Sequence, residues 1–119
     1  MDTPTDPTTS APLACNLQAI PLDERERHVR TAPLLFQRVR EQQELPDGLA
    51  FRFAADDYLA VADFIAYDRL CCPFFSFTVE VSPNHGPVWL RITGPAGAKA
   101  ELVASLIDAL PAAHAGSAQ

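Results

Sequence analysis

Residues 75–93 read FSFTVEVSPNHGPVWLRIT, and this stretch carries the clearest structural signal in the sequence. On both sides of a central turn, apolar side chains alternate with polar ones, which is typical of two strands that each bury one face. If Val81 pairs with Val88, both apolar sets lie on the same side of the ribbon, and residues 83–86 form the connecting loop. The stretch therefore predicts an antiparallel β-hairpin with one face in the core.

The segments around this hairpin predict three helices and two further strands. Immediately before it, the apolar spacing of residues 58–72 indicates a helix, which must end at Pro73 because proline cannot continue it. The other predicted elements are a strand at 13–17, a helix at 23–44 that Pro33 should kink or divide, a strand at 49–53 and a helix from Gly94 to about Leu110. The order β-α-β-α-β-β-α predicts an α+β fold, in which helices cover one face of an antiparallel sheet of about four strands.

The length of the chain, 119 residues, is enough for one domain, which we expect at residues 13–110. Residues 1–12 are rich in Thr, Pro and Asp, and residues 111–119 are mostly small or polar. Such segments have little apolar surface to bury, so we expect both to be disordered tails.

Charge and hydropathy argue against two classes of partner. The formal net charge is −6, which repels phosphate backbones, so we expect no nucleic acid partner. No apolar run approaches the ~18 residues that a membrane span needs, so we expect no membrane partner either. The N-terminus has neither the basic nor the hydrophobic region of a secretory signal. We therefore expect a cytoplasmic protein.

The three cysteines carry the strongest functional signal. Cys71 and Cys72 are adjacent at the end of a predicted helix, and Cys15 falls on the inward side of the first predicted strand. They could be simple core residues, since free cysteine is among the most buried residue types. In a reducing compartment, however, clustered thiols are more typical of metal ligands or catalysts, and the odd number argues against a disulfide framework. We expect the Cys15 sulfur within about 4 Å of one of the other two, close enough to share an ion.

The ligand types predict which ion such a site would hold. Three thiolates suit trigonal Hg(II), Cu(I) or As(III) better than Zn(II), which needs a fourth ligand. Candidates for a fourth ligand are Asp68, His28 and His85, but both histidines are expected at the surface, and His114 lies in the C-terminal tail. The sequence therefore predicts a protein that binds a soft metal or metalloid ion through its three cysteines.

A cysteine-dependent enzyme is the first alternative. Asp68 lies one helical turn before Cys71 and could act as an acid or base beside a thiolate-bound ligand, or it could be an ordinary solvated carboxylate. Organomercurial lyases use two cysteines and an aspartate to protonate a carbon–mercury bond, which is a chemical parallel and not an evolutionary one. Redox cycling of Cys71 with Cys72 is not expected, because a helix C-terminus disfavours a free thiolate and a disulfide between neighbours distorts the peptide bond.

The second alternative is an interaction module without a ligand, which would form a homodimer through the outer face of the sheet. Trp89 falls on that face, among Ser76, Thr78, Glu80 and Arg91. A large aromatic side chain is costly to leave in water, so we expect a second copy of the chain to cover this face.

Several of these segments resemble a group of small, uncharacterised bacterial proteins. The shared motifs are ACxL at 14–17, ELPDG at 44–48, RxCCPF at 69–74 and PVWLxITGP at 87–95. The similarity covers about residues 13–110. Genes of this group are associated with MerR-type metal-responsive regulators, so the resemblance implies a thiol site for a soft metal or metalloid and a role in metal resistance. It supplies no catalytic mechanism.

Overall fold

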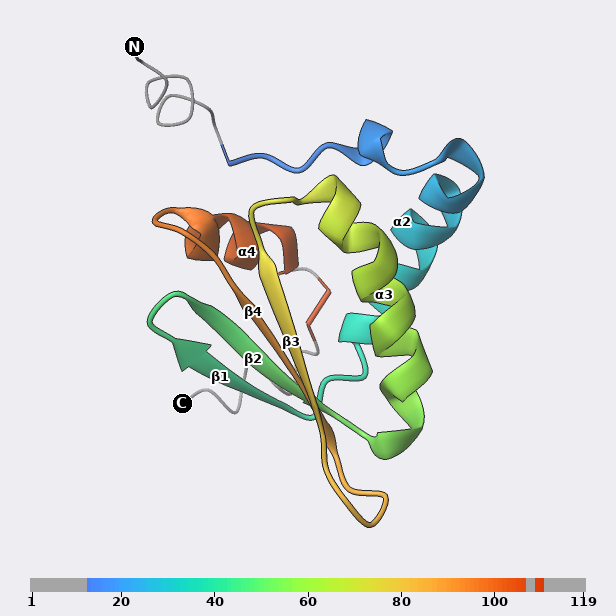
Figure 1. Cartoon of the computed structure of the whole chain (residues 1–119), viewed down its shortest axis with the longest axis vertical. Coiled ribbons are helices and arrows are strands. Elements are labelled where there is room, and N and C mark those ends of the chain that lie inside the picture. Colours follow the sequence, from blue (N-terminus) through green and yellow to red (C-terminus); the bar gives the residue numbers. More distant parts are fainter. Residues whose placement is uncertain (1–12, 107–108, 111–119) are drawn as a thin grey trace.

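The computed structural model describes residues 13–106 and 109–110, so the two expected tails, 1–12 and 111–119, lie outside the described residues. The elements, in chain order, are η1 (Leu17–Ala19), α2 (Leu22–Phe36), β1 (Glu41–Leu45), β2 (Gly48–Phe53), η2 (Ala55–Asp57), α3 (Tyr58–Cys71), β3 (Ser76–Val81), β4 (Val88–Thr93) and α4 (Ala98–Leu106), where η marks a short 3-10 helix. Figure 1 shows the helices alongside a twisted sheet. The predicted α+β class is confirmed.

The sheet has four strands in the order β1-β2-β4-β3, and all neighbours are antiparallel. The predicted hairpin register is confirmed, because Val81 pairs with Val88. Ser82 N donates to Pro87 O at 3.2 Å, which leaves residues 83–86 as the loop. Asn84 and His85 complete this loop with positive φ angles of 59° and 58°.

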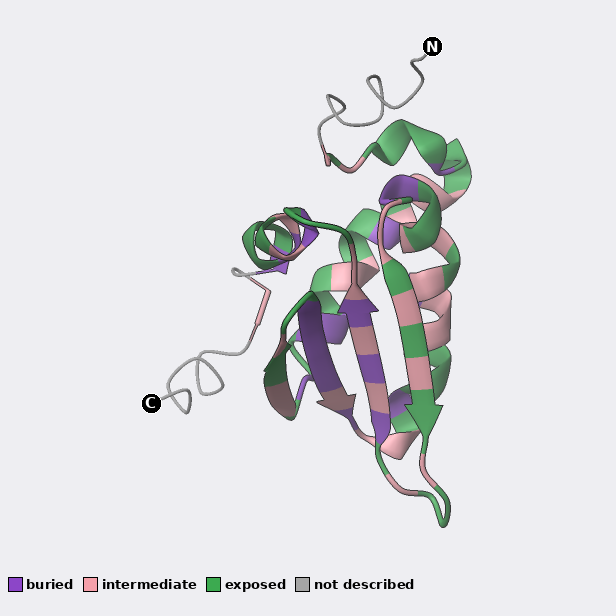
Figure 2. Ribbon diagram, turned by 60° about the vertical axis from the view of Figure 1, so that its left-hand side comes forward, coloured by how far each residue is buried: buried purple, intermediate pink, exposed green. Residues whose placement is uncertain are grey.

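One apolar cluster joins the inner face of the sheet to all three α-helices, so these helices lie on the same side. Figure 2 shows the result along β4, where buried and half-buried residues alternate. The largest fully buried side chains of the cluster are Phe36, Phe51, Phe53, Leu49, Leu90, Ile92, Val61 and Val88. Phe36 is central, with its ring 5.1 Å from the ring of Phe51 and edge-on to it. The cluster confirms the prediction that helices cover one face.

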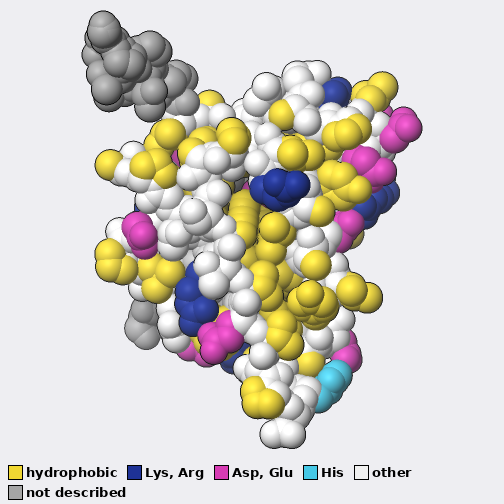
Figure 3. Space-filling model, in the orientation of Figure 1, with side chains coloured by type: hydrophobic (Ala, Val, Ile, Leu, Met, Phe, Trp, Pro, Cys, Tyr) yellow, Lys and Arg dark blue, Asp and Glu magenta, His cyan; other side chains and the backbone are white. Residues whose placement is uncertain are grey.

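The edge strand β3 is less well covered than β4, and its inward side chains Phe77 and Val79 are only half-buried. Hydrophobic side chains gather on the surface between β3 and α3, as Figure 3 shows. On the outer face of the sheet, Trp89 pairs with Arg52 on one side and Glu80 on the other, and it is half-buried. Trp89 is therefore less exposed than the sequence suggests, and the homodimer through this face stays a prediction.

Two predicted elements near the N-terminus are wrong. The helix expected at 23–44 ends at Phe36, and residues 41–45 form β1 instead. Arg40 N donates to Arg52 O at 2.8 Å, so the chain has already joined the sheet there. The strand expected at 13–17 does not form, and this segment lies over the end of α3. None of the described helices is long and apolar enough to cross a membrane.

An ion pair links α2 to α3. Arg27 donates two hydrogen bonds to Asp63, at 2.9 Å and 2.7 Å, and these bonds hold the pKa of the Asp63 carboxyl below its usual range. A lowered pKa in the folded state stabilises the protein above the unfolded pKa of ~3.9 and loses that effect as the pH falls through the folded value.

We therefore expect Asp63→Asn to lower the stability slightly at neutral pH, because the pair is more than a third exposed and solvent screens it. The difference from wild type should shrink as the pH falls below about 4 and vanish once the carboxyl is protonated in both states. The urea unfolding midpoints of the wild type and of Asp63→Asn, recorded between pH 2 and pH 7, measure this difference in stability. A difference that persists at the lowest pH would mean that the ion pair is not its cause.

Candidate functional site

The end of helix α3 positions two of the three cysteines. Cys72 N donates to Asp68 O at 2.7 Å, which closes the last helical turn, and Pro73 then prevents the helix from continuing. Cys71 is the last residue of α3 and Cys72 follows it, with only 3% of each exposed. The helix thus ends where the sequence predicts, and both side chains are buried.

The third cysteine comes from residues 13–20, which we call the N-terminal strap. Asn16 N donates to Cys71 O at 2.8 Å, so the strap satisfies a carbonyl that the end of the helix leaves without an intrahelical partner. Ile20 is fully buried and packs against Cys71 and Cys72. Arg25 adds hydrogen bonds to two strap carbonyls, Leu17 O at 3.0 Å and Ile20 O at 3.1 Å. These contacts bring Cys15 over the end of α3.

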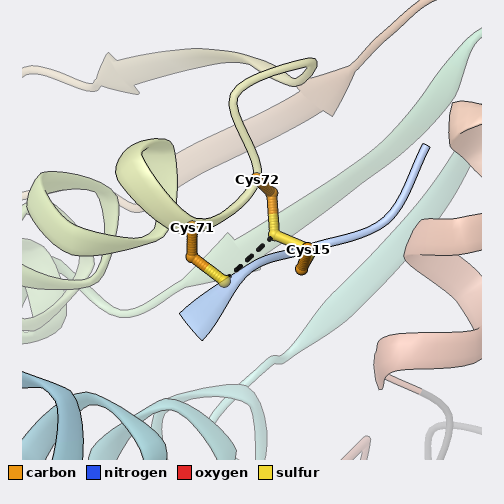
Figure 4. A group of neighbouring side chains, drawn as sticks. All are labelled: Cys15, Cys71 and Cys72. Carbon is orange, nitrogen blue, oxygen red and sulfur yellow. Dashed lines mark hydrogen bonds between the residues drawn. A yellow bond between two sulfur atoms is a disulfide. The ribbon is translucent and has the colours of Figure 1, made fainter. Parts of the chain in front are cut away.

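The three sulfurs lie together, and Figure 4 shows their arrangement. All three Sγ atoms lie within 4.8 Å of one another, which confirms the predicted cluster of Cys15, Cys71 and Cys72. Cys15 and Cys72 form a disulfide, and Cys71 remains a free thiol. The odd number of cysteines argued against a disulfide framework, and the bond between Cys15 and Cys72 corrects that expectation. Local residue patterns did not predict the bond, because it depends on where the strap crosses the helix.

The free thiol of Cys71 is buried and lies near the negative charge of Asp68. Its Sγ is 3.7 Å from the Sγ of Cys72, and only Cys71 carries a proton, so Cys71 is the donor in this weak contact. Burial raises the pKa of the Cys71 thiol, the negative charge of Asp68 raises it further, and the Asn16 N–H opposes both. Cys71 is thus held as a neutral thiol at neutral pH.

Asp68 has a partner that the sequence did not predict. His28 Nε2 lies 3.2 Å from Asp68 Oδ1, and His28 is only 5% exposed, so the expectation that His28 lies at the surface is wrong. The imidazole stacks on the ring of Phe64, with the ring centroids 5.5 Å apart, and its Nδ1 has no hydrogen-bond partner among the described residues. Asp68 is therefore an ordered, largely buried carboxylate next to the cysteines and not a solvated one.

Neither of the two histidines in the described part of the chain, His28 and His85, supplies a fourth ligand atom to the cysteine cluster. Among the described residues, the three cysteines form the one group of three or more His, Cys, Asp or Glu side chains with ligand atoms close enough for an ion. His85 is exposed in the hairpin loop, as expected, where it pairs with Asp56 at 3.1 Å. His114 lies outside the described residues.

We expect His28→Ala to lower the free energy of unfolding by about 1–3 kcal/mol, because it removes a buried hydrogen-bond partner of Asp68. If the cysteine cluster takes up an ion, the same variant should bind it as the wild type does, since His28 is not part of that cluster. Urea unfolding and native mass spectrometry measure the two properties. His85→Ala is the matched control, with an expected change within about 0.5 kcal/mol because His85 is exposed. Ion binding that is lost in His28→Ala and kept in His85→Ala would contradict the separation of His28 from the cysteine site.

Comparisons with known proteins add no relative to this picture. No protein-family model matches the chain. Searches of curated proteins and of solved structures also find no significant match. The function of the chain must therefore be inferred from the geometry and chemistry of the cysteine site itself.

Proposed function

We propose that the protein binds a soft metal or metalloid ion through Cys15, Cys71 and Cys72 when all three are reduced. The observation that carries the proposal is the distance between the ligand atoms, because the three Sγ atoms lie within 4.8 Å of one another. Metal–sulfur bonds of ~2.3 Å in a trigonal plane place the sulfurs about 4 Å apart. The separation of 3.7 Å between Cys71 and Cys72 is close to that value.

The surroundings of the cysteines support a soft, three-coordinate ion. Ile20 is fully buried against Cys71 and Cys72, and the aromatic side chains of Tyr67, Phe74 and Phe75 pack nearby. Thiolates in an apolar setting favour Hg(II), Cu(I) and As(III), whereas a structural zinc site needs a fourth protein ligand. The described residues supply no fourth ligand atom within the cluster, so we propose that zinc binds less tightly than these ions.

Charge orders the three candidate ions. Three thiolates form a neutral complex with As(III), a complex with one negative charge with Hg(II) and one with two negative charges with Cu(I). Burying an uncompensated charge is costly, and the negative charge of Asp68 already acts on Cys71. We therefore propose that As(III) suits this site best once the affinity of each ion for free thiols is taken into account.

Native mass spectrometry of the reduced protein, with As(III), Hg(II), Cu(I) and Zn(II) offered in turn, tests the proposal. One ion per chain is expected for As(III), Hg(II) and Cu(I). Competition against a small trithiol then gives their order of affinity relative to free thiols. Each single Cys→Ser variant should weaken As(III) binding at least about 100-fold, since each removes one of three bonds. Lys99→Ala, which alters a surface contact with Glu44, is the control with unchanged binding. Absence of any bound ion would end the proposal.

A second candidate function is protonolysis of an organomercurial. In this reaction Asp68 accepts the proton that a cysteine thiol loses on binding mercury and passes it to the carbon, so that the carbon–mercury bond breaks and hydrocarbon leaves. Its support is the position of Asp68, which is largely buried and acts electrostatically on Cys71. Release of hydrocarbon from an arylmercury compound, lost in Asp68→Asn while Hg(II) binding persists, is the expected result. If the wild-type protein binds the arylmercury compound without releasing hydrocarbon, the chemistry is binding alone.

A further inference from the structure

The three cysteines differ in their access to solvent. Cys15 is partly exposed, whereas Cys71 and Cys72 are each 3% exposed. Thiol–disulfide exchange proceeds by attack of a thiolate on one of the two bonded sulfurs, and access decides which one is attacked. A thiol from solution therefore reaches the Cys15 end of the disulfide much more readily than the Cys72 end.

We propose that Cys15 is a site of reversible modification by a low-molecular-weight thiol, and that this exchange controls whether the ion site exists. The thiolate attacks Cys15 Sγ, a new disulfide forms between the small thiol and Cys15, and the bond between Cys15 and Cys72 breaks. Cys72 Sγ leaves with the electron pair and takes up the proton of the small thiol. A second small thiol attacks the sulfur of the first, which releases an oxidised small disulfide and returns Cys15 as a thiol.

Exchange at Cys15 would control ion binding, and this control rests on the proposed function. In the oxidised protein, two of the three ligand sulfurs are bonded to each other and cannot serve as thiolate ligands. After exchange with two small thiols, all three sulfurs are thiols and the complete ligand set is available. Ion binding in turn withdraws Cys15 and Cys72 from re-oxidation.

Cys71 remains outside the exchange although its Sγ is only 3.7 Å from the Sγ of Cys72. A bond between the two neighbours would distort the peptide that joins them. That peptide is fixed on both sides, because Asn16 N donates to Cys71 O at 2.8 Å and Cys72 N donates to Asp68 O at 2.7 Å. Cys15 and Cys72 are therefore the pair that closes again on oxidation.

The contacts of the N-terminal strap make the exchange reversible. Burial of Ile20 and the hydrogen bonds of Asn16 and Arg25 do not involve sulfur, so they persist in the reduced protein. They hold Cys15 near Cys72, which raises the effective concentration of one thiol towards the other. The strap thus favours re-formation of the same disulfide over a lasting mixed disulfide.

The test uses the oxidised wild-type chain with a metal chelator present, so that no ion takes part. Graded glutathione is added, acid stops the exchange, and free thiols are then alkylated with excess N-ethylmaleimide in denaturant near neutral pH before peptide mapping assigns the products. The expected intermediate carries glutathione on Cys15 and maleimide on Cys72, at least about tenfold more abundant than the reverse. Glutathione on Cys72, or a disulfide between Cys71 and Cys72, would overturn the proposal, as would a bond that excess glutathione never reduces.

A variant of the strap provides a second measurement. Ile20→Ala should shift the equilibrium against glutathione towards the reduced form by about tenfold or more, because a weaker strap lowers the effective concentration of Cys15. Leu22→Ala, at an exposed position just after the strap, is the matched control and should leave the equilibrium unchanged. Equal equilibria for the wild type and Ile20→Ala would contradict the role of the strap.

The two proposals fail separately. Arsenite offered to oxidised and reduced samples should bind only to the reduced one. Exchange at Cys15 without arsenite, Hg(II) or Cu(I) binding in the reduced sample would overturn the proposed function and leave the modification site standing. Equal arsenite binding by both samples would overturn redox control while supporting a metalloid site.

Discussion

Replacing Cys15 with serine is expected to lower the free energy of unfolding of the oxidised protein by about 2–4 kcal/mol. The disulfide joins residues separated by 57 positions, so it restricts a long loop of the unfolded chain, whose entropy rises when the bond is removed. Serine fits this position with little disturbance because Cys15 is only partly buried. Guanidinium unfolding curves of the two oxidised proteins measure the difference.

The control for this prediction is the reduced state. In the presence of a strong reductant, wild type and Cys15→Ser should unfold at nearly the same midpoint, because neither has the bond. Cys71→Ser keeps the Cys15–Cys72 pair, so its stability should still fall when reductant is added. A wild-type protein whose stability does not respond to reductant would show that the bond contributes nothing in solution.

Replacing Phe36 with alanine should cost about 3–5 kcal/mol, the largest loss expected from a single core substitution in this chain. Phe36 is fully buried, and its ring contacts those of Phe51, Phe53 and Phe64 at centroid distances of 5.1, 6.1 and 5.0 Å. It therefore joins α2 to both the sheet and α3. A domain of this size is usually stable by about 5–15 kcal/mol, so the variant should be close to unfolding at 37 °C.

Thermal and urea unfolding monitored by circular dichroism measure this effect. Leu59→Ala is the matched control, because Leu59 is 77% exposed and its loss should change the stability by less than about 0.5 kcal/mol. A loss below about 1 kcal/mol for Phe36→Ala would mean that α2 does not depend on this aromatic contact.

The hairpin of β3 and β4 could be predicted down to its register, whereas β1 could not. The alternation in β4 reflects real one-sided burial, with Val88, Leu90 and Ile92 inside and Trp89 and Arg91 half-buried. Strand β1 reads EQQEL, and none of its residues is buried. At the edge of a sheet, backbone pairing with β2 holds such a strand, so its polar side chains give no period of two. The same residues favour a helix by propensity alone, which explains the overlong helix prediction.

The three cysteines of the candidate site could be predicted from the sequence, but the contacts around them could not. The adjacent Cys71 and Cys72, followed by Pro73, indicated a helix end with two sulfurs, and that is where they lie. The pairing of Cys15 with Cys72 and that of His28 with Asp68 both depend on how distant segments cross. His28 lies in an Arg/Glu-rich part of α2, and only the packing of α2 against α3 determines that its ring faces inward. A sequence pattern indicates which side of a single helix or strand is apolar. Which side chains meet where two elements cross depends on how those elements pack.

The N-terminal strap has a consequence for the synthesis of the chain. Cys15 leaves the ribosome 57 residues before Cys72, which takes about 3–11 s at ~5–20 residues per second. Throughout that interval the first thiol has neither of its two neighbours, so the nascent chain exposes it to any cellular thiol or oxidant. Helix α3 must then be complete before the strap has a surface on which to lie. Assembly of the site is therefore a late event of folding, and ribosome-bound chains that stop short of residue 71 should carry Cys15 as a single reactive thiol.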